Sequence, residues 1–216
     1  MAGTHIVLMG VAGSGKTTVA EALDRKLGWP SGEADAFHPE ANIEKMSRGV
    51  ALTDQDRWPW LDRIVAWTAE HDAAGHSTVV TCSALKRIYR DRLRTAPGTT
   101  VFVHLSGSEA LLADRMAHRA GHFMPTSLLP SQFATLEPLE ADELGFAVDV
   151  TPGVDEIVRQ ILDGLAARGI AVGTNATEAA TTALEANGVE RNGAGRNGTE
   201  LNGVELNNTI KPGEDA

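Results

Sequence analysis

Little cysteine, a shortage of basic charge and the lack of long apolar runs are the first features of this 216-residue sequence. Its single cysteine, Cys82, excludes a disulfide within the chain, and we expect a small buried strand-end residue there rather than a nucleophile. The formal net charge of −10 argues against a surface that follows nucleic-acid phosphates. No apolar run approaches the ~18 residues of a membrane span, and the first residues lack signal-peptide features. We expect a cytoplasmic protein that binds neither nucleic acid nor membrane.

The histidines likewise offer no metal site. His5 lies at the start of an expected strand, and His71 and His76 lie around an expected loop. We expect all three to be solvated, and no spacing of His and Cys suggests zinc.

The strongest pattern lies in residues 5–27, where an apolar run leads into a glycine-rich turn and then into apolar residues at helical spacing. The turn matches G-x-x-x-x-G-K-S/T at every fixed position. Glycines let backbone N–H groups wrap phosphates, and the N-terminus of the next helix adds partial positive charge. Lys16 is placed for the β- and γ-phosphates and the Thr17 hydroxyl for Mg²⁺. The predicted nucleotide-binding residues here are Gly10, Val11, Ala12, Gly13, Ser14, Gly15, Lys16, Thr17 and Thr18.

The following residues alternate between strand and helix patterns. After a short strand before residues 33–39, the sequence predicts helices at 41–48, 53–75, 86–95, 108–119 and 154–168, and strands at 77–81, 99–105 and 146–150. Such alternation predicts an α/β protein with helices on both faces of a parallel sheet. Together with the glycine-rich turn, it makes the P-loop kinase fold the expected fold class.

Two segments interrupt this alternation. Residues 121–137 lose regular periodicity and contain two prolines, which predicts a mobile lid at about 120–137. From residue 171 the composition changes to Asn, Gly, Thr, Ala and Glu, with too few large apolar residues to offset ordering entropy. We therefore expect a kinase domain over 1–170 and a disordered tail over 171–216.

The remainder of the sequence discriminates among P-loop proteins. The strand at 77–81 ends in Cys82-Ser83, without the acidic pair that motor-type ATPases use to hold Mg²⁺ and activate water. The chain also lacks an Asn-Lys-x-Asp guanine reader. An acidic cluster after the second strand, a basic helix after the third and arginines before the lid are instead typical of a small-molecule kinase that excludes water.

Four blocks of residues between 35 and 137 resemble the gluconokinase family. They are Asp35-Ala36-Phe37-His38-Pro39 with Asn42-Ile43, Lys45-Met46 and Gly49; Leu52, Asp54, Asp56-Arg57 and Pro59-Trp60-Leu61; Cys82-Ser83-Ala84-Leu85-Lys86 with Tyr89-Arg90-Asp91 and Leu93-Arg94; and His122-Phe123-Met124 with Gln132-Phe133 and Leu136-Glu137. The chain departs from the family pattern at Ala34, where glycine is frequent, and in its tail. The resemblance implies ATP-dependent phosphorylation of D-gluconate at its terminal hydroxyl, giving 6-phosphogluconate, and suggests a homodimer.

Gluconate carries one carboxylate and several hydroxyls, so its site needs cations and polar groups. Lys86 and Arg90 lie four residues apart and are expected to share a helix face that supplies the positive charge. A solvated surface face is the alternative for this basic helix. Asp35 and His38 are expected to contact the substrate, with Asp35 as the catalytic base, and His122 is a further predicted contact.

Arg115 and Arg119 also lie four residues apart, at the entrance to the lid. Of these two predicted catalytic residues, we expect one to stack on adenine and the other to meet the transferring phosphoryl group. Exposed arginines paired with Glu109 or Asp114 are the alternative. Pro152 follows the last strand and is predicted to contact the nucleotide base.

Two other functions stay open at this point. A shikimate-type kinase would share the phosphate loop, the lid and the acid, although the glycine-rich triplet expected after its third strand is absent here. A nucleotide-binding regulator without transfer activity is disfavoured because Lys16, Thr17, Asp35 and the two arginines before the lid are all present.

Overall fold

The computed structural model describes residues 2–118 and 129–173, and within them five parallel strands form one sheet in the order β2-β3-β1-β4-β5. The strands are β1 (Thr4–Met9), β2 (Ser31–Glu33), β3 (Thr78–Thr81), β4 (Thr99–Ser106) and β5 (Gly145–Asp149). Among the helices of these two ranges, none combines the length and apolar character needed to cross a bilayer.

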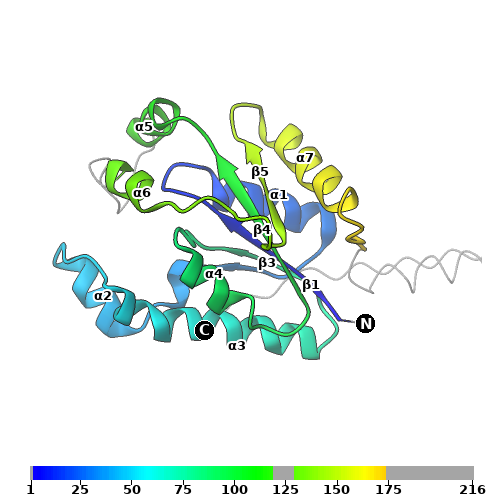
Figure 1. Cartoon of the computed structure of the whole chain (residues 1–216), viewed down its shortest axis with the longest axis horizontal. Helices are drawn as coiled ribbons and strands as arrows, with labels where there is room; N and C mark the ends of the chain where they lie inside the picture. The colour runs from blue at the N-terminus through cyan, green and yellow to red at the C-terminus, as the bar shows by residue number, and fades with distance from the viewer. Residues whose placement is uncertain (1, 119–128, 174–216) are drawn as a thin grey trace, which may run out of the picture.

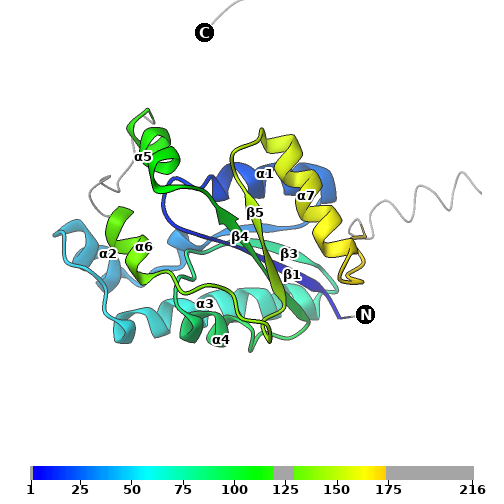
Figure 2. The same cartoon turned by 45° about the horizontal axis from the view of Figure 1, so that its top comes forward.

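Helices cover both faces of the sheet, as the alternation of patterns predicted (Figures 1 and 2). One face is covered by α1 (Lys16–Leu27) and α7 (Val154–Ala166), the other by α3 (Asp54–Ala73) and α4 (Arg87–Leu93). The apolar run of β1 contributes to the cores on both faces of the sheet. Ile6 and Leu8 lie in the core beneath α1 and α7, whereas Val7 and Met9 lie in the core on the opposite face. Strands buried on both faces need such a continuous apolar run.

The other helices of the described residues are η1 (Ala34–Phe37, a 3₁₀ turn), α2 (Glu40–Ser47), α5 (Glu109–Ala117) and α6 (Leu129–Thr135). Two predicted helix starts are confirmed. Thr53 forms a reciprocal capping box with Asp56 before α3, and the Ser108 side chain accepts from the backbone of Leu111 in α5.

The predicted lid needs a correction, because α6 is a helix inside the segment 121–137 that the sequence predicted to be irregular. Leu129 of α6 is 1% exposed and joins the core cluster, against which Phe133 also packs. Burial of one apolar face stabilises this short helix, which local propensity alone would not. Residues 119–128, including the predicted site residues Arg119 and His122, lie outside the described residues.

The packed domain extends to Gly173, beyond the predicted end at residue 170. The indole Nε1 of the buried Trp29 donates to the carbonyl oxygen of Gly173 over 2.7 Å. Ile170 and Val172 pack against the core between α1 and α7. The predicted disordered tail, apart from 171–173, lies outside the described residues.

Truncation tests this boundary. A chain ending at residue 173 is expected to keep the melting temperature of the full chain. A chain ending at 169 should melt on the order of 5 °C lower, because it loses two apolar contacts and leaves the buried Trp29 N–H unpaired. In a Trp29→Phe background the difference should shrink, since no indole N–H remains. Equal thermal melting of the 169 and 173 chains would contradict the assignment.

Candidate active site

Several of the predicted site residues lie at one edge of the sheet. The turn of residues 10–17 follows β1, Asp35 follows β2, residues 82–86 follow β3 and Pro152 follows β5. Parallel strands end at a common edge, and ligands of open α/β sheets bind there.

The glycine-rich turn has the backbone of a phosphate cradle. Gly13 and Gly15 have φ angles of 77° and 87°, which side-chain-bearing residues rarely adopt. A Cβ on Gly13 would also lie 2.8 Å from Cγ of Met116. Helix α1 starts after Gly15 with no side-chain cap from the described residues and no acidic residue in its first turn. Its first N–H groups therefore suit an anion.

Two polar side chains of this turn also fit a phosphate ligand. Lys16 folds back, and its Nζ donates to the carbonyl oxygens of Gly10 and Val11, each over 3.0 Å. The hydroxyl of Ser14 is buried and has no hydrogen-bond partner among the described residues. Native proteins rarely leave such a group unpaired, so a ligand oxygen nearby is a reasonable partner.

Gln132 of α6 is a site residue that sequence reasoning missed. Its Oε1 accepts the backbone N–H of Ala12 over 2.7 Å, which brings α6 onto the phosphate loop. The sequence contained a signal, because the block Gln132-Phe133 belongs to the family resemblance. The spacing of residues alone did not connect α6 with a turn near the N-terminus.

Cys82 lies at the centre of the sheet edge. It is buried, as the sequence predicted, and burial raises the pKa of its thiol to about 12. The charges of Lys16, Asp35 and Arg57 also act on this pKa.

Asp35 and His38 occupy different environments at the end of β2. Asp35 is exposed on η1, and its carboxylate has no hydrogen-bond partner among the described residues. His38 is 8% exposed and stacks on Trp60, with 4.4 Å between ring centroids. Burial lowers the pKa of His38, which keeps the imidazole neutral at pH 7. Asp35 is therefore the accessible acid of this segment, and a substrate contact by His38 stays a prediction.

Lys86 and Arg90 do not share a helix face, which corrects the sequence prediction. Lys86 precedes α4 in an extended conformation, so the four-residue helical spacing does not apply. Its Nζ donates to both carboxylate oxygens of Asp54, over 2.8 and 2.9 Å. Arg90 is 0% exposed and bonded within the protein, so its guanidinium is not available to a substrate.

Arg57 is a second residue that sequence reasoning missed, and it replaces Arg90 as a candidate cation. Its guanidinium lies 5.5 Å from the ring centroid of Tyr89. The pKa of His38 is lowered mainly by burial, and the charge of Arg57 lowers it further. The pKa of Asp54 is lowered mainly by the hydrogen bond from Lys86, and the charge of Arg57 again adds to this effect. The described residues give Arg57 no hydrogen bond or ion pair. A half-buried guanidinium in this position suits a carboxylate ligand.

Arg115 lies beside the predicted base-binding turn. Its Nη2 donates to the carbonyl oxygen of Val150 over 2.7 Å, which places it next to the segment of Pro152. In the structure Arg115 therefore binds Val150, whereas the alternative prediction paired it with Glu109 or Asp114. Nucleotide contacts by Arg115 and Pro152 stay predictions.

Burial of histidines predicts a pH-dependent stability. Desolvation lowers the pKa values of His5, His38 and His104. The prediction that His5 is solvated is wrong, because His5 is 1% exposed and bonded to Thr78. Below about pH 6.5 the unfolded chain binds more protons than the folded chain, so stability should fall as the pH falls from 7 to 5.

Thermal melting between pH 8 and pH 5 measures this dependence. His5→Gln should flatten the curve, whereas His76→Gln, at an exposed position, should leave its slope unchanged. Identical slopes in the two variants would remove His5 from the explanation.

Comparisons with known proteins show which family the chain resembles. A family model described as an AAA domain matches residues 6–124. A gluconokinase from Gluconobacter oxydans (strain 621H) is 51% identical over 157 residues, which cover 73% of this chain and 88% of that protein.

Two crystal structures are also similar. An unliganded sugar kinase from Janibacter sp. HTCC2649 is 48% identical with a TM-score of 0.73, and the match covers 80% of this chain and 99% of that one. A gluconokinase from Sinorhizobium meliloti 1021 is 54% identical with a TM-score of 0.66, covering 76% of this chain and 92% of that one. With this identity over nearly the full length of its relatives, and with the phosphate loop and acid at one sheet edge, the chain belongs to the gluconokinase family.

Proposed function

We propose that this protein is a gluconokinase that transfers the γ-phosphoryl group of ATP to the terminal hydroxyl of D-gluconate, giving 6-phospho-D-gluconate. One observation carries the proposal: the phosphate loop and the exposed carboxylate of Asp35 lie at one sheet edge, with residues 82–86 between them. A nucleotide donor and a hydroxyl acceptor can therefore be held side by side.

Residues of the phosphate loop hold the nucleotide. Backbone N–H groups at the start of α1 contact the phosphates, and Lys16 exchanges the carbonyls of Gly10 and Val11 for phosphate oxygens. Arg115 and Pro152 lie where they can contact the remainder of the nucleotide.

Thr17 contributes its hydroxyl to Mg²⁺, which neutralises phosphate charge when bound. No group of three His, Cys, Asp or Glu side chains within 2–118 and 129–173 is arranged to hold a metal. Mg²⁺ at such a site would take most of its other ligands from water and phosphate oxygens.

The acceptor lies on the side of β2 and β3. Asp35 accepts the proton of the gluconate hydroxyl and orients its oxygen toward the phosphoryl group. Arg57 binds the gluconate carboxylate. Lys86 adds positive charge to the acceptor site while it keeps its hydrogen bond to Asp54. Arg119 and His122 stay predictions for the same reaction.

A substrate panel tests this function. The protein is incubated with Mg-ATP and, separately, gluconate, other sugar acids, polyols and shikimate, while ADP formation is followed. We expect gluconate alone to accelerate ADP release strongly, with equimolar 6-phosphogluconate. Stimulation by shikimate instead would identify a shikimate-type kinase. ATP binding without transfer to any acceptor would identify a nucleotide-binding regulator.

A further inference from the structure

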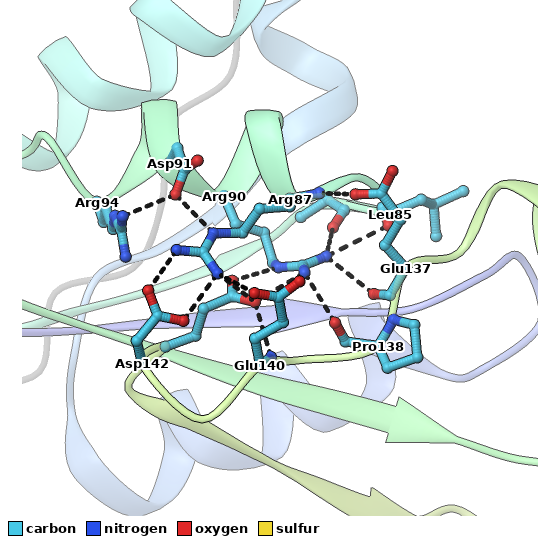
Figure 3. A network of polar contacts seen from close by, with 11 residues as sticks. Leu85, Arg87, Arg90, Asp91, Arg94, Glu137, Pro138, Glu140 and Asp142 are labelled. Atoms are coloured by element: carbon cyan, nitrogen blue, oxygen red, sulfur yellow. Dashed lines mark hydrogen bonds and ion pairs between the residues drawn. The ribbon is translucent and has the colours of Figure 1, made fainter.

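Arg90 is the most heavily bonded buried side chain of the described structure. Its Nε and Nη2 donate to the two carboxylate oxygens of Glu143, over 2.6 and 2.9 Å. The remaining donors reach four backbone carbonyl oxygens, those of Ala84, Leu85, Glu137 and Pro138, at 3.1–3.3 Å (Figure 3). These acceptors belong to two separate segments that both border the active site.

The first segment is the acceptor loop, residues 82–86, which lies between the phosphate loop and Asp35. The backbone N–H of Gly10 donates to the carbonyl of Ser83 over 3.2 Å, so this loop and the phosphate loop are in direct contact. Ala84 has a φ of 42°, in the left-handed region that alanine disfavours. The surroundings must therefore hold this conformation, and Arg90 binds the Ala84 carbonyl.

The second segment is the connecting arm, residues 136–144, which joins α6 to β5. Glu143 is buried and fixes the arm to Arg90, and its Oε2 also accepts the backbone N–H of Glu140. The arm is bonded to the acceptor loop as well, because the N–H of Glu137 donates to the carbonyl of Leu85 over 2.8 Å. At the other end of α6, Gln132 contacts the phosphate loop.

We propose that Arg90 is a positioning residue for phosphoryl transfer, holding the acceptor loop and the connecting arm together so that α6 and the acceptor site keep one fixed geometry. This inference rests on the proposed function. Arg90 touches no substrate. It acts through the Ala84 and Leu85 carbonyls on one side and through Glu143 on the other. Its loss therefore displaces the acceptor loop and α6, while the nucleotide cradle on α1 stays intact.

The test separates positioning from simple stability. Removing Arg90 alone leaves a buried Glu143 charge and risks unfolding, so the main variant is Arg90→Met combined with Glu143→Leu, which removes both charges. The matched control is Arg92→Met on the same helix, where the arginine pairs with the exposed Asp62 and does not reach the arm. Thermal melting, affinity for a non-hydrolysable ATP analogue, kcat and KM for gluconate, and the ratio of ADP to phosphorylated product are measured.

We expect the double variant to fold and to bind the ATP analogue within a few-fold of wild type. Its kcat/KM for gluconate should fall on the order of 10²-fold, because small displacements of reacting groups have effects of this size. ADP should exceed phosphorylated product, since a displaced α6 leaves the phosphate loop open to water. The Arg92→Met control should match wild type in every measurement.

Unchanged kcat/KM with equimolar ADP and product in the folded double variant would overturn the inference. An equal fall in analogue affinity and kcat/KM would also overturn it, because Arg90 would then stabilise the whole fold rather than position the acceptor. If the double variant does not fold, Arg90→Lys and Glu143→Gln are subjected to the same criteria, because each keeps part of the hydrogen bonding. A wild-type chain that leaves gluconate unchanged would contradict the proposed function, whereas an active wild type with an unaffected double variant contradicts only this inference.

Discussion

Replacing Asp35 with asparagine is expected to lower kcat on the order of 10² or more, the scale of general-base loss, while ATP affinity stays within a few-fold of wild type. Asparagine keeps the shape of the side chain and removes the proton acceptor. Because the Asp35 carboxylate has no hydrogen bond among the described residues, the substitution should also leave the melting temperature unchanged.

The measurements are kcat, ATP affinity and thermal melting on one preparation. Glu40→Gln is the matched control, since Glu40 is another exposed acid, in the first turn of α2, and should tolerate the change. If Asp35 only stabilised the turn that follows it, the variant would melt earlier and keep near-normal kcat. That result would mean that a different acid activates the acceptor.

Lys16→Ala is expected to weaken nucleotide binding and turnover together. Lys16 meets the phosphates in the ground state and the transition state, so its removal affects both. We expect kcat to fall on the order of 10²–10³, as for loss of one preorganised electrostatic contact, with a clear fall in ATP affinity. The two substitutions therefore have different signatures: Asp35→Asn separates binding from chemistry, and Lys16→Ala does not.

Lys16→Arg is the informative companion variant, because it retains the charge and changes the shape of the donor. Activity close to wild type would indicate that charge alone suffices at this position. Normal ATP affinity in a folded Lys16→Ala protein, measured by titration with a non-hydrolysable analogue, would contradict the assignment of residues 10–17 as the phosphate cradle.

The sequence alone was sufficient for the elements that local patterns encode. Local signals predict the phosphate loop, the two helix starts at Thr53 and Ser108, and the order of strands and helices. The structure confirms both helix starts and the order of the elements. Placing Asp35 at the same edge as the loop needed only the rule that parallel strands end together. The homodimer and the cytoplasmic location stay predictions.

Contacts between residues far apart in the sequence could not be predicted. The four-residue spacing of Lys86 and Arg90 predicts a shared face toward the substrate. Arg90 instead binds Glu143, 53 residues away, and no local pattern indicates that the two meet inside the protein. Helix α6 was missed because it has only seven residues, and its contact with Ala12 joins positions 120 residues apart. His5 shows the same limit, since its burial depends on Thr78 in a neighbouring strand.

Burial of Cys82 has a practical consequence for spectroscopy. Thiol-directed dyes react with the thiolate, and a pKa of about 12 leaves almost none of it in the native protein near neutral pH. Cys82 is also the single cysteine of the chain. A cysteine introduced at the exposed Ala134 of α6 would therefore accept a fluorophore at one defined position without removal of the native thiol. The position of α6 with and without substrates could then be followed by fluorescence in the otherwise natural sequence.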